Sequence, residues 1–205
     1  MIKGLDCIIP GGISAEDFSV VSNTDEETSK KILDDLVRAG IGVRDDDVFS
    51  FSPADKLKAA IFALKKGAFV EEVSSKLDWK DFEGLVAEVL QSKDFATIRN
   101  YYLKKPRMEI DVVGIRLGIA MLIDCKHWNK SSLSALHDAV EKQVNRTKHY
   151  VANTSGAMAV PVIVTLYQDE IDFIKKVPIV PISRFSSFID EFYGNLDKME
   201  PIESN

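Results

Sequence analysis

The sequence has few of the features that mark a secreted or membrane-spanning protein. Its two cysteines, Cys7 and Cys125, cannot form a disulfide framework, and their spacing matches no zinc site. No stretch approaches the roughly 18 uninterrupted apolar residues that a membrane span needs, and the N-terminus has no basic region leading into an apolar run. We therefore expect a reduced, cytoplasmic protein with no membrane partner.

Positive charge is also scarce, which at first argues against a nucleic-acid partner. The formal net charge is −6, yet residues 90–150 hold 11 Lys and Arg against 6 Asp and Glu, together with all 3 histidines. Because salt screens surface charge beyond about 8–10 Å, a basic patch on an acidic protein can still bind phosphates. The alternative is an ordinary uneven surface, unless chemistry is found in the same stretch.

The first part of the chain, residues 1–75, has the predicted order helix, helix, hairpin, helix. Thr24 and Glu27 form a capping box before a helix that stops at Gly40. The turn of the hairpin is the acidic run 45–47. This order resembles a winged helix-turn-helix, and a small helical cap without a DNA role is an equal alternative. Aspartates at the tip of a wing would be repelled by phosphates.

The second part, residues 76–205, alternates between helices and strands. Asp78 belongs to an Asp-x-Lys triplet that falls at a helix start, so we interpret it as a cap. The order implies an α/β domain with a mixed sheet. The predicted elements are a helix from Asp78, strands over 95–103, 108–115 and 118–126, a helix over 133–151, a strand over 159–166, a helix from about Asp169, a strand over 177–182 and a terminal helix.

Charged side chains converge at one end of the hairpin over residues 108–126. Because side chains alternate along a strand, Asp124 and Lys126 share a face, with Cys125 opposite. Asp111 comes from the neighbouring strand and lies within cross-strand reach. Burying such charges is costly unless they are paired or bind a cation. The pattern therefore predicts a cation site or, alternatively, a salt-bridged strand end.

Two helices offer polar side chains to the same region. Glu83 falls beside Leu90 at the edge of its helix's apolar stripe, so its acid can lean over the sheet. On the long helix, Gln143, Arg146 and Tyr150 share one flank of the apolar stripe. Taken alone, that flank is more typical of a solvated surface than of a site.

Together these segments resemble the PD-(D/E)XK nucleases, and within them the Mrr-type restriction endonucleases and their archaeal relatives. The resemblance covers roughly residues 79–185 and rests on the runs 82–87, 110–113 and 123–126, followed by a helix that carries a Gln. It implies a restriction-endonuclease-like αβββαβ core and magnesium-dependent hydrolysis of phosphodiesters. One departure is that Glu109-Ile110 precedes the first aspartate where the motif's name expects Pro.

The resemblance also assigns roles by position. Asp111 matches the metal-binding aspartate and Asp124 the second acidic ligand. Lys126 matches the catalytic lysine, and Glu83 the acidic residue of the first helix. Gln143 matches a glutamine often found on the helix after the lysine strand. Hard oxygen ligands of this kind suit Mg²⁺, and Mn²⁺ should substitute for it.

The remaining expectations concern further ligands and partners. The backbone carbonyl of Cys125 is well placed as a metal ligand, whereas we interpret Trp128 as a packing residue. We expect a DNA substrate, and homodimerisation is plausible for cutting both strands. A DNA-binding regulatory protein with a non-cutting nuclease fold and an RNA-processing nuclease are the alternatives. The residues expected to contact DNA are Lys104, Lys105, Arg107, Arg146 and His127.

Overall fold

The computed structural model describes residues 2–128, 132–167 and 171–204. The chain divides into two compact units, 1–81 and 82–205, so the division follows Asp81, where the sequence had suggested residue 75. Within the described residues, no helix is both long and apolar enough to cross a membrane.

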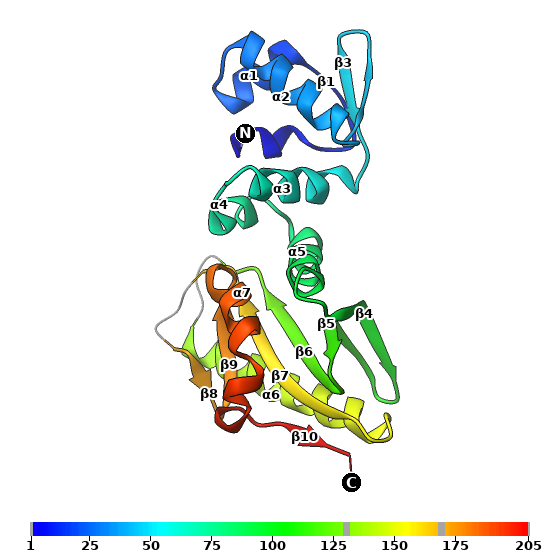
Figure 1. The fold of residues 1–205 in the computed structure, drawn as a ribbon, viewed down its shortest axis with the longest axis vertical. Coiled ribbons are helices and arrows are strands. Elements are labelled where there is room, and N and C mark those ends of the chain that lie inside the picture. Colours follow the sequence, from blue (N-terminus) through cyan, green and yellow to red (C-terminus); the bar gives the residue numbers. More distant parts are fainter. Residues whose placement is uncertain (1, 129–131, 168–170, 205) are drawn as a thin grey trace. The chain divides into compact units, whose positions relative to one another are not determined.

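The first unit is a small antiparallel sheet with helices (Figure 1). In the sheet, the strand that precedes the helices pairs with the second strand of the hairpin, giving the order β1-β3-β2. The hairpin and the helices that the sequence predicted are present, and the winged-helix-like character of this unit stays a prediction. Its elements are η1 (Lys3–Cys7), β1 (Gly11–Ser14), α1 (Ala15–Ser22), α2 (Glu26–Arg38), β2 (Val43–Asp45), β3 (Val48–Phe51), α3 (Asp55–Lys65) and α4 (Val70–Ser74).

One helix start in this unit differs from the expectation. The N-cap of α2 is Asp25, whose Oδ1 accepts the Thr28 N–H at 2.8 Å, so the capping box from Thr24 is wrong. The Thr24 hydroxyl instead bonds to the Ser29 hydroxyl at 2.7 Å. An ionised carboxylate one residue later is the stronger acceptor for the first turn, and the helix begins one residue later as a result. The predicted stop is confirmed by Gly40, whose φ is +76°.

The second unit is built around a mixed seven-stranded sheet. It begins within α5 (Trp79–Gln91), a helix whose first turn is capped by Asp78 through the Asp81 N–H at 2.9 Å, as predicted. The other elements are β4 (Ala96–Lys104), β5 (Arg107–Arg116), β6 (Ile119–Lys126), α6 (Leu133–Ala152), β7 (Met158–Thr165), β8 (Phe173–Ile174), β9 (Val177–Pro181), α7 (Ile182–Glu191), η2 (Tyr193–Lys198) and β10 (Ile202–Glu203).

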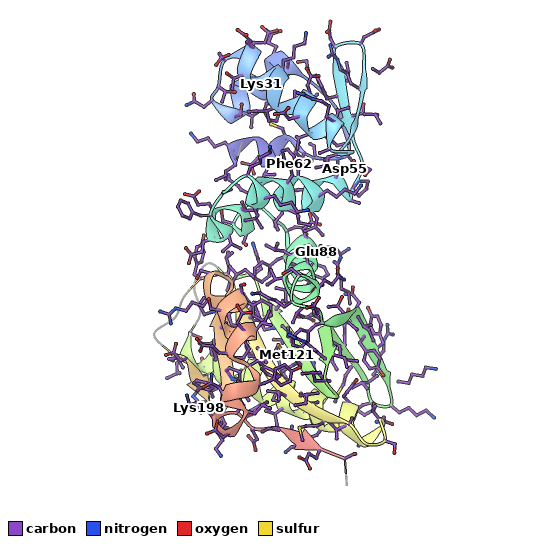
Figure 2. The ribbon with its side chains drawn as sticks, viewed as in Figure 1. Lys31, Asp55, Phe62, Glu88, Met121 and Lys198 are labelled. Carbon is purple, nitrogen blue, oxygen red and sulfur yellow. The ribbon has the colours of Figure 1, made fainter. Side chains whose placement is uncertain are left out.

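The sheet has the order β4-β5-β6-β7-β9-β8, with β10 paired to β7. Strands β4 to β6 form an antiparallel meander, and β6, β7 and β9 are parallel. Helix α7 covers one face and α6 the other (Figure 1). Met121 of β6, labelled in Figure 2, is fully buried within this unit. The order α5-β4-β5-β6-α6-β7 is the αβββαβ core of a restriction-endonuclease-like fold, so the predicted fold class is confirmed.

The helix predicted from about Asp169 is wrong. Residues 168–170 lie outside the described part of the chain, and the segment that follows is β8, in a hairpin with β9. The turn between them holds Lys175 and Lys176 at φ values of 48° and 62°. Ile171 and Ile174 are three residues apart and imitate helical spacing, but both pack on the cluster beneath α6 from an extended segment.

A close approach in the core positions the first helix of this unit. At Gly114 of β5, a Cβ atom would lie 2.9 Å from Cδ1 of Leu90 on α5. The absence of a side chain at this position therefore lets α5 lie against the strand that carries Asp111. That contact brings the acidic residue of α5, Glu83, to the same region of the sheet.

Candidate functional site

The sheet forks at the positions of the predicted site. Strands β5 and β6 pair from Arg116↔Ile119 as far as Val112↔Ile123. At the next step, the Asp111 carboxylate replaces the backbone as acceptor, because its Oδ2 accepts the Cys125 N–H at 2.7 Å. Beyond this point β5 follows β4 and β6 follows β7. The fork therefore has Asp111 on one arm and residues 124–126 on the other.

Asp124 is almost completely buried, and two cations lie against it. Its side chain is 2% exposed. Oδ1 accepts a hydrogen bond from Nη1 of Arg146 at 2.7 Å. Oδ2 forms an ion pair with Nζ of Lys126 at 2.6 Å. The angles of this contact are not those of a hydrogen bond, so Oδ2 is a buried oxygen without a hydrogen-bond partner. The expected convergence of Asp124 and Lys126 on one face is present.

Gln143 and Arg146 form a polar chain that leads from α6 into the fork. The Gln143 amide donates to the Leu122 carbonyl at 2.8 Å, and its Oε1 accepts from Arg146 Nη1 at 3.2 Å. Gln143 and Tyr150 are buried, so the reading of this helix flank as a solvated surface is wrong. Gln143 thus acts on the site through Arg146.

Glu83 of α5 is a buried acid with an unsatisfied oxygen. It is 5% exposed, and its Oε2 has no hydrogen-bond partner. Burial and, next, repulsion from Asp111 raise the pKa of Glu83 from 4.5 to about 7, against the opposing influence of Arg99 and Asn100. The sequence had placed Glu83 at the edge of the apolar stripe, whereas the structure buries its side chain completely enough to raise its pKa.

Asp111 is a second acid whose raised pKa the nearby positive charges do not offset. Burial and repulsion from Asp124 raise the pKa of Asp111 from 3.8 to about 6, although the Cys125 N–H, Lys126 and Arg146 oppose the rise. In a cluster whose acids were fully compensated by ion pairs, these pKa values would be lowered. The fork therefore favours a further cation.

The donors of the fork fit a hard divalent cation. The Cys125 thiol is not among them, because burial raises its pKa well above the ordinary value and keeps it protonated. Within the described residues, no three His, Cys, Asp or Glu side chains are grouped as a metal site. Mg²⁺ needs only one or two carboxylates and keeps several waters. Asp111, Asp124 Oδ2 and the Cys125 carbonyl are the groups that could hold it, with Glu83 near Asp111.

The basic residues predicted to contact DNA lie in two different environments. Lys104, Lys105 and Arg107 are exposed around the turn between β4 and β5, with the Arg107 guanidinium 6.0 Å from the centroid of the Tyr102 ring. At about 3.3 Å per strand residue, Arg107 lies roughly 13 Å along β5 from Asp111. Arg146, in contrast, is engaged by Asp124.

The residues that follow Lys126 pack against their neighbours. The rings of His127 and Phe82 meet edge to face with their centroids 5.2 Å apart. Trp128 packs on the cluster beneath α6, and its ring centroid lies 5.5 Å from Lys126 Nζ. The structure thus gives Trp128 the packing contact expected from the sequence and sets its ring beside the lysine.

Three neighbours of Glu83 were not recognised as site residues from the sequence. They are Arg99, Asn100 and Glu109, and all three influence the pKa of Glu83. Asn100 has a φ of 50° in the middle of β4, and its amide donates to Glu109 Oε1 at 3.1 Å. An asparagine within a β-branched and aromatic strand is the one signal that could have indicated this kink, since Asn tolerates the left-handed region.

Comparisons with solved structures support the fold. The chain as a whole resembles the crystal structure of protein VC1899 from Vibrio cholerae, with a TM-score of 0.50 and 14% identity over 100% of this chain and 52% of that one. Weaker similarities, too low to bear on function, are to AF1548, a protein of unknown function, and to Can2 from Sulfobacillus thermosulfidooxidans in complex with cyclic tetra-adenylate. For AF1548 the TM-score is 0.33, with 21% identity over 56% of this chain and 52% of that chain. For Can2 the TM-score is 0.38, with 13% identity over 78% of this chain and 43% of that chain. This chain therefore spans about half the length of the solved structures it resembles.

The comparison with other sequences gives one relative. No protein-family model matches the chain. An uncharacterized protein of Archaeoglobus fulgidus is 34% identical to it over 119 residues, which make up 56% of this chain and 92% of the relative. At this identity, and with almost the whole relative covered, the chain belongs to the same family as this uncharacterized archaeal protein.

Proposed function

We propose that this protein is a Mg²⁺-dependent endonuclease that hydrolyses phosphodiester bonds in DNA. The observation that carries the proposal is the fork between β5 and β6. There the buried Asp124 and the half-buried Asp111 lie beside Lys126, and Oδ2 of Asp124 has no hydrogen-bond partner. We also propose that the protein belongs to the PD-(D/E)XK nucleases, near the Mrr-type branch that its sequence motifs resemble.

Each residue of the fork has a role in this proposal. A divalent cation bound there would lower the pKa of a water and stabilise charge on the phosphate oxygens. Asp111, Asp124 and the Cys125 carbonyl hold the site, and Glu83, with its unpartnered Oε2, binds a water or second ion beside Asp111. Lys126 orients the attacking water or neutralises the developing negative charge.

The distribution of charge supports a nucleic-acid substrate, which we propose to be DNA. The net charge of −6 disfavours nonspecific binding over the whole surface. The exposed basic side chains of Lys104, Lys105 and Arg107 surround the turn between β4 and β5, and Arg107 begins the strand that carries Asp111. Neighbouring phosphates of a nucleic acid bound at the fork would find these positive charges on the same strand pair. The N-terminal unit is not part of this proposed surface, because Asp45, Asp46 and Asp47 at the tip of its hairpin would repel phosphates.

A non-cutting DNA-binding protein is the second candidate, and one observation favours it. Asp124 is already neutralised by Arg146 and Lys126, as in a salt-bridged strand end. Against this stand the raised pKa values of Glu83 and Asp111, to about 7 and about 6, which are caused by burial and then by repulsion between the acids and which the nearby cations do not offset.

The experiment that tests the proposal uses the purified protein with supercoiled, linear, single-stranded and branched DNA and with RNA, in Mg²⁺ or EDTA. We expect Mg²⁺-dependent cleavage of DNA, together with its loss in EDTA. DNA binding without cleavage of any form would support the non-cutting candidate. Cleavage of RNA alone would support an RNA-processing enzyme on the same fold.

A further inference from the structure

The two oxygens of Asp124 are held in different ways. Oδ1 accepts a well-directed hydrogen bond from Arg146 at 2.7 Å. Oδ2 has the Lys126 ammonium at 2.6 Å but no hydrogen bond. The hydrogen bond therefore fixes the orientation of Oδ1, whereas the negative charge on Oδ2 is balanced only by the nearby ammonium.

The two cations are also anchored differently. Arg146 bonds to Gln143 at 3.2 Å, and Gln143 is fully buried and fastened to the Leu122 carbonyl at 2.8 Å. Lys126 has a flexible four-carbon stem, and its ammonium lies 5.5 Å from the Trp128 ring centroid. Neither that ring contact nor the ion pair fixes the direction of the ammonium. Displacing Lys126 from Asp124 therefore breaks no hydrogen bond of the fork, whereas displacing Arg146 breaks two.

We propose that Arg146 is a positioning residue: it holds Oδ1 of Asp124 and so leaves Oδ2 as the oxygen that binds a divalent cation. Lys126 then leaves Oδ2 when the cation binds and pairs with the phosphate of the substrate instead. The inference rests on the proposed nuclease function. A divalent cation and an ammonium cannot both lie against Oδ2 without strong repulsion, and Lys126 is the one of the two that is free to leave. Once it has left Oδ2, the ammonium is available to pair with a phosphate oxygen of the substrate.

The two roles predict opposite effects on metal binding. The test measures Mn²⁺ binding to the metal-free protein without DNA, by the loss of the free-ion electron paramagnetic resonance signal. Lys126→Gln removes a competitor for Oδ2 and should bind Mn²⁺ several-fold more tightly than the wild type. Arg146→Gln frees the carboxylate to rotate and should weaken binding by about 10-fold or more, as for other residues that orient a ligand.

Two further variants separate orientation from charge. Arg146→Lys keeps the positive charge but cannot reach Gln143 and Asp124 together, so it should also weaken Mn²⁺ binding. Lys142→Gln removes a charge from an exposed position on the same helix and should leave binding unchanged. A far-ultraviolet circular dichroism melt of each variant establishes that it is folded.

A fluorescence measurement follows the lysine itself. Replacing Trp79, which is 56% exposed, by Phe leaves Trp128 as the reporter beside Lys126. Addition of Mg²⁺ should change the Trp128 emission of this protein, because the ammonium moves relative to the ring. The change should be absent once Lys126→Gln is added.

The possible results distinguish this inference from the proposed function. Tighter Mn²⁺ binding by both Lys126→Gln and Arg146→Gln would make the two cations plain competitors and overturn the positioning role. If the wild type binds Mn²⁺ and cleaves DNA but Arg146→Gln binds Mn²⁺ equally tightly, this inference is wrong and the proposed function stands. A wild type that binds no Mn²⁺ and cleaves nothing would overturn the proposed function and this inference with it.

Discussion

Gln143 donates its side-chain amide to the backbone carbonyl of Leu122 at 2.8 Å, which fastens the middle of α6 to β6 two residues before Asp124. Both groups are fully buried, so the bond forms where an unpaired amide or carbonyl would cost about 1–3 kcal/mol. The same Gln143 side chain receives Arg146, and Arg146 holds Asp124. The geometry of the fork therefore depends on a helix that contributes no metal ligand of its own.

Removing either charged group of the Asp-x-Lys pair should abolish cleavage. Asp124→Asn and Lys126→Ala should each lower the rate of Mg²⁺-dependent cleavage at least about 100-fold, because a cation ligand or a charge-stabilising donor is lost. Rates are measured under single-turnover conditions, with Lys142→Gln as the control. Wild-type rates in both variants would contradict the assignment of the site.

The sequence predicted the parts of the site that follow from local periodicity. Alternation along β6 puts Asp124 and Lys126 on one face, and the turn at Leu117 and Gly118, with φ values of 50° and 79°, returns the chain so that Asp111 lies next to them. The cap at Asp78 was also predicted, because it depends on residues within one turn of the helix.

The remaining parts depend on contacts between distant segments, which one sequence does not encode as a pattern. The direction of the Arg146 side chain follows from the burial of Gln143 against Leu122, which are 21 residues apart. The depth of Glu83 follows from the close approach of Leu90 to Gly114. The kink at Asn100 interrupts the alternation of β4, so a face could not be assigned to its neighbours.

The identity of the metal should affect binding and cutting differently. Mn²⁺ should support cleavage, whereas Ca²⁺ should permit DNA binding with little cleavage, since it is larger, tolerates irregular coordination and polarises water less. Gel-shift and cleavage assays on one substrate, with each metal in turn, measure the two effects. Full activity in EDTA would exclude the proposed chemistry.

DNA affinity should depend on the basic turn between β4 and β5. Replacing Lys104, Lys105 and Arg107 with Ala should weaken binding to all sequences and flatten the plot of log affinity against log salt. Each lost phosphate contact on duplex DNA changes the slope by about 0.9. The matched control replaces three exposed lysines of the first unit, Lys30, Lys31 and Lys65, with Ala. If that control loses the affinity and the first variant keeps it, the winged-helix-like unit is the principal DNA-binding surface.

The acids of the fork should make the metal-free protein less stable as pH rises. The pKa of Glu83 is raised from 4.5 to about 7 in the folded state, mainly by burial, so the folded protein binds this proton more tightly than the unfolded chain does. Its stabilising contribution is complete below about pH 4.5 and is lost as pH rises through 7, and the raised pKa of Asp111, about 6, acts in the same direction. A rise in the pKa of Glu83 from 4.5 to about 7 corresponds to roughly 3 kcal/mol. Glu83→Gln stays neutral, so in EDTA its free energy of unfolding should fall less between pH 5 and pH 8 than that of the wild type.

Urea denaturation at several pH values measures the difference, with the exposed Glu88→Gln on the same helix as control. Parallel pH profiles for wild type and Glu83→Gln would mean that Glu83 titrates normally and that the fork has no shortage of positive charge.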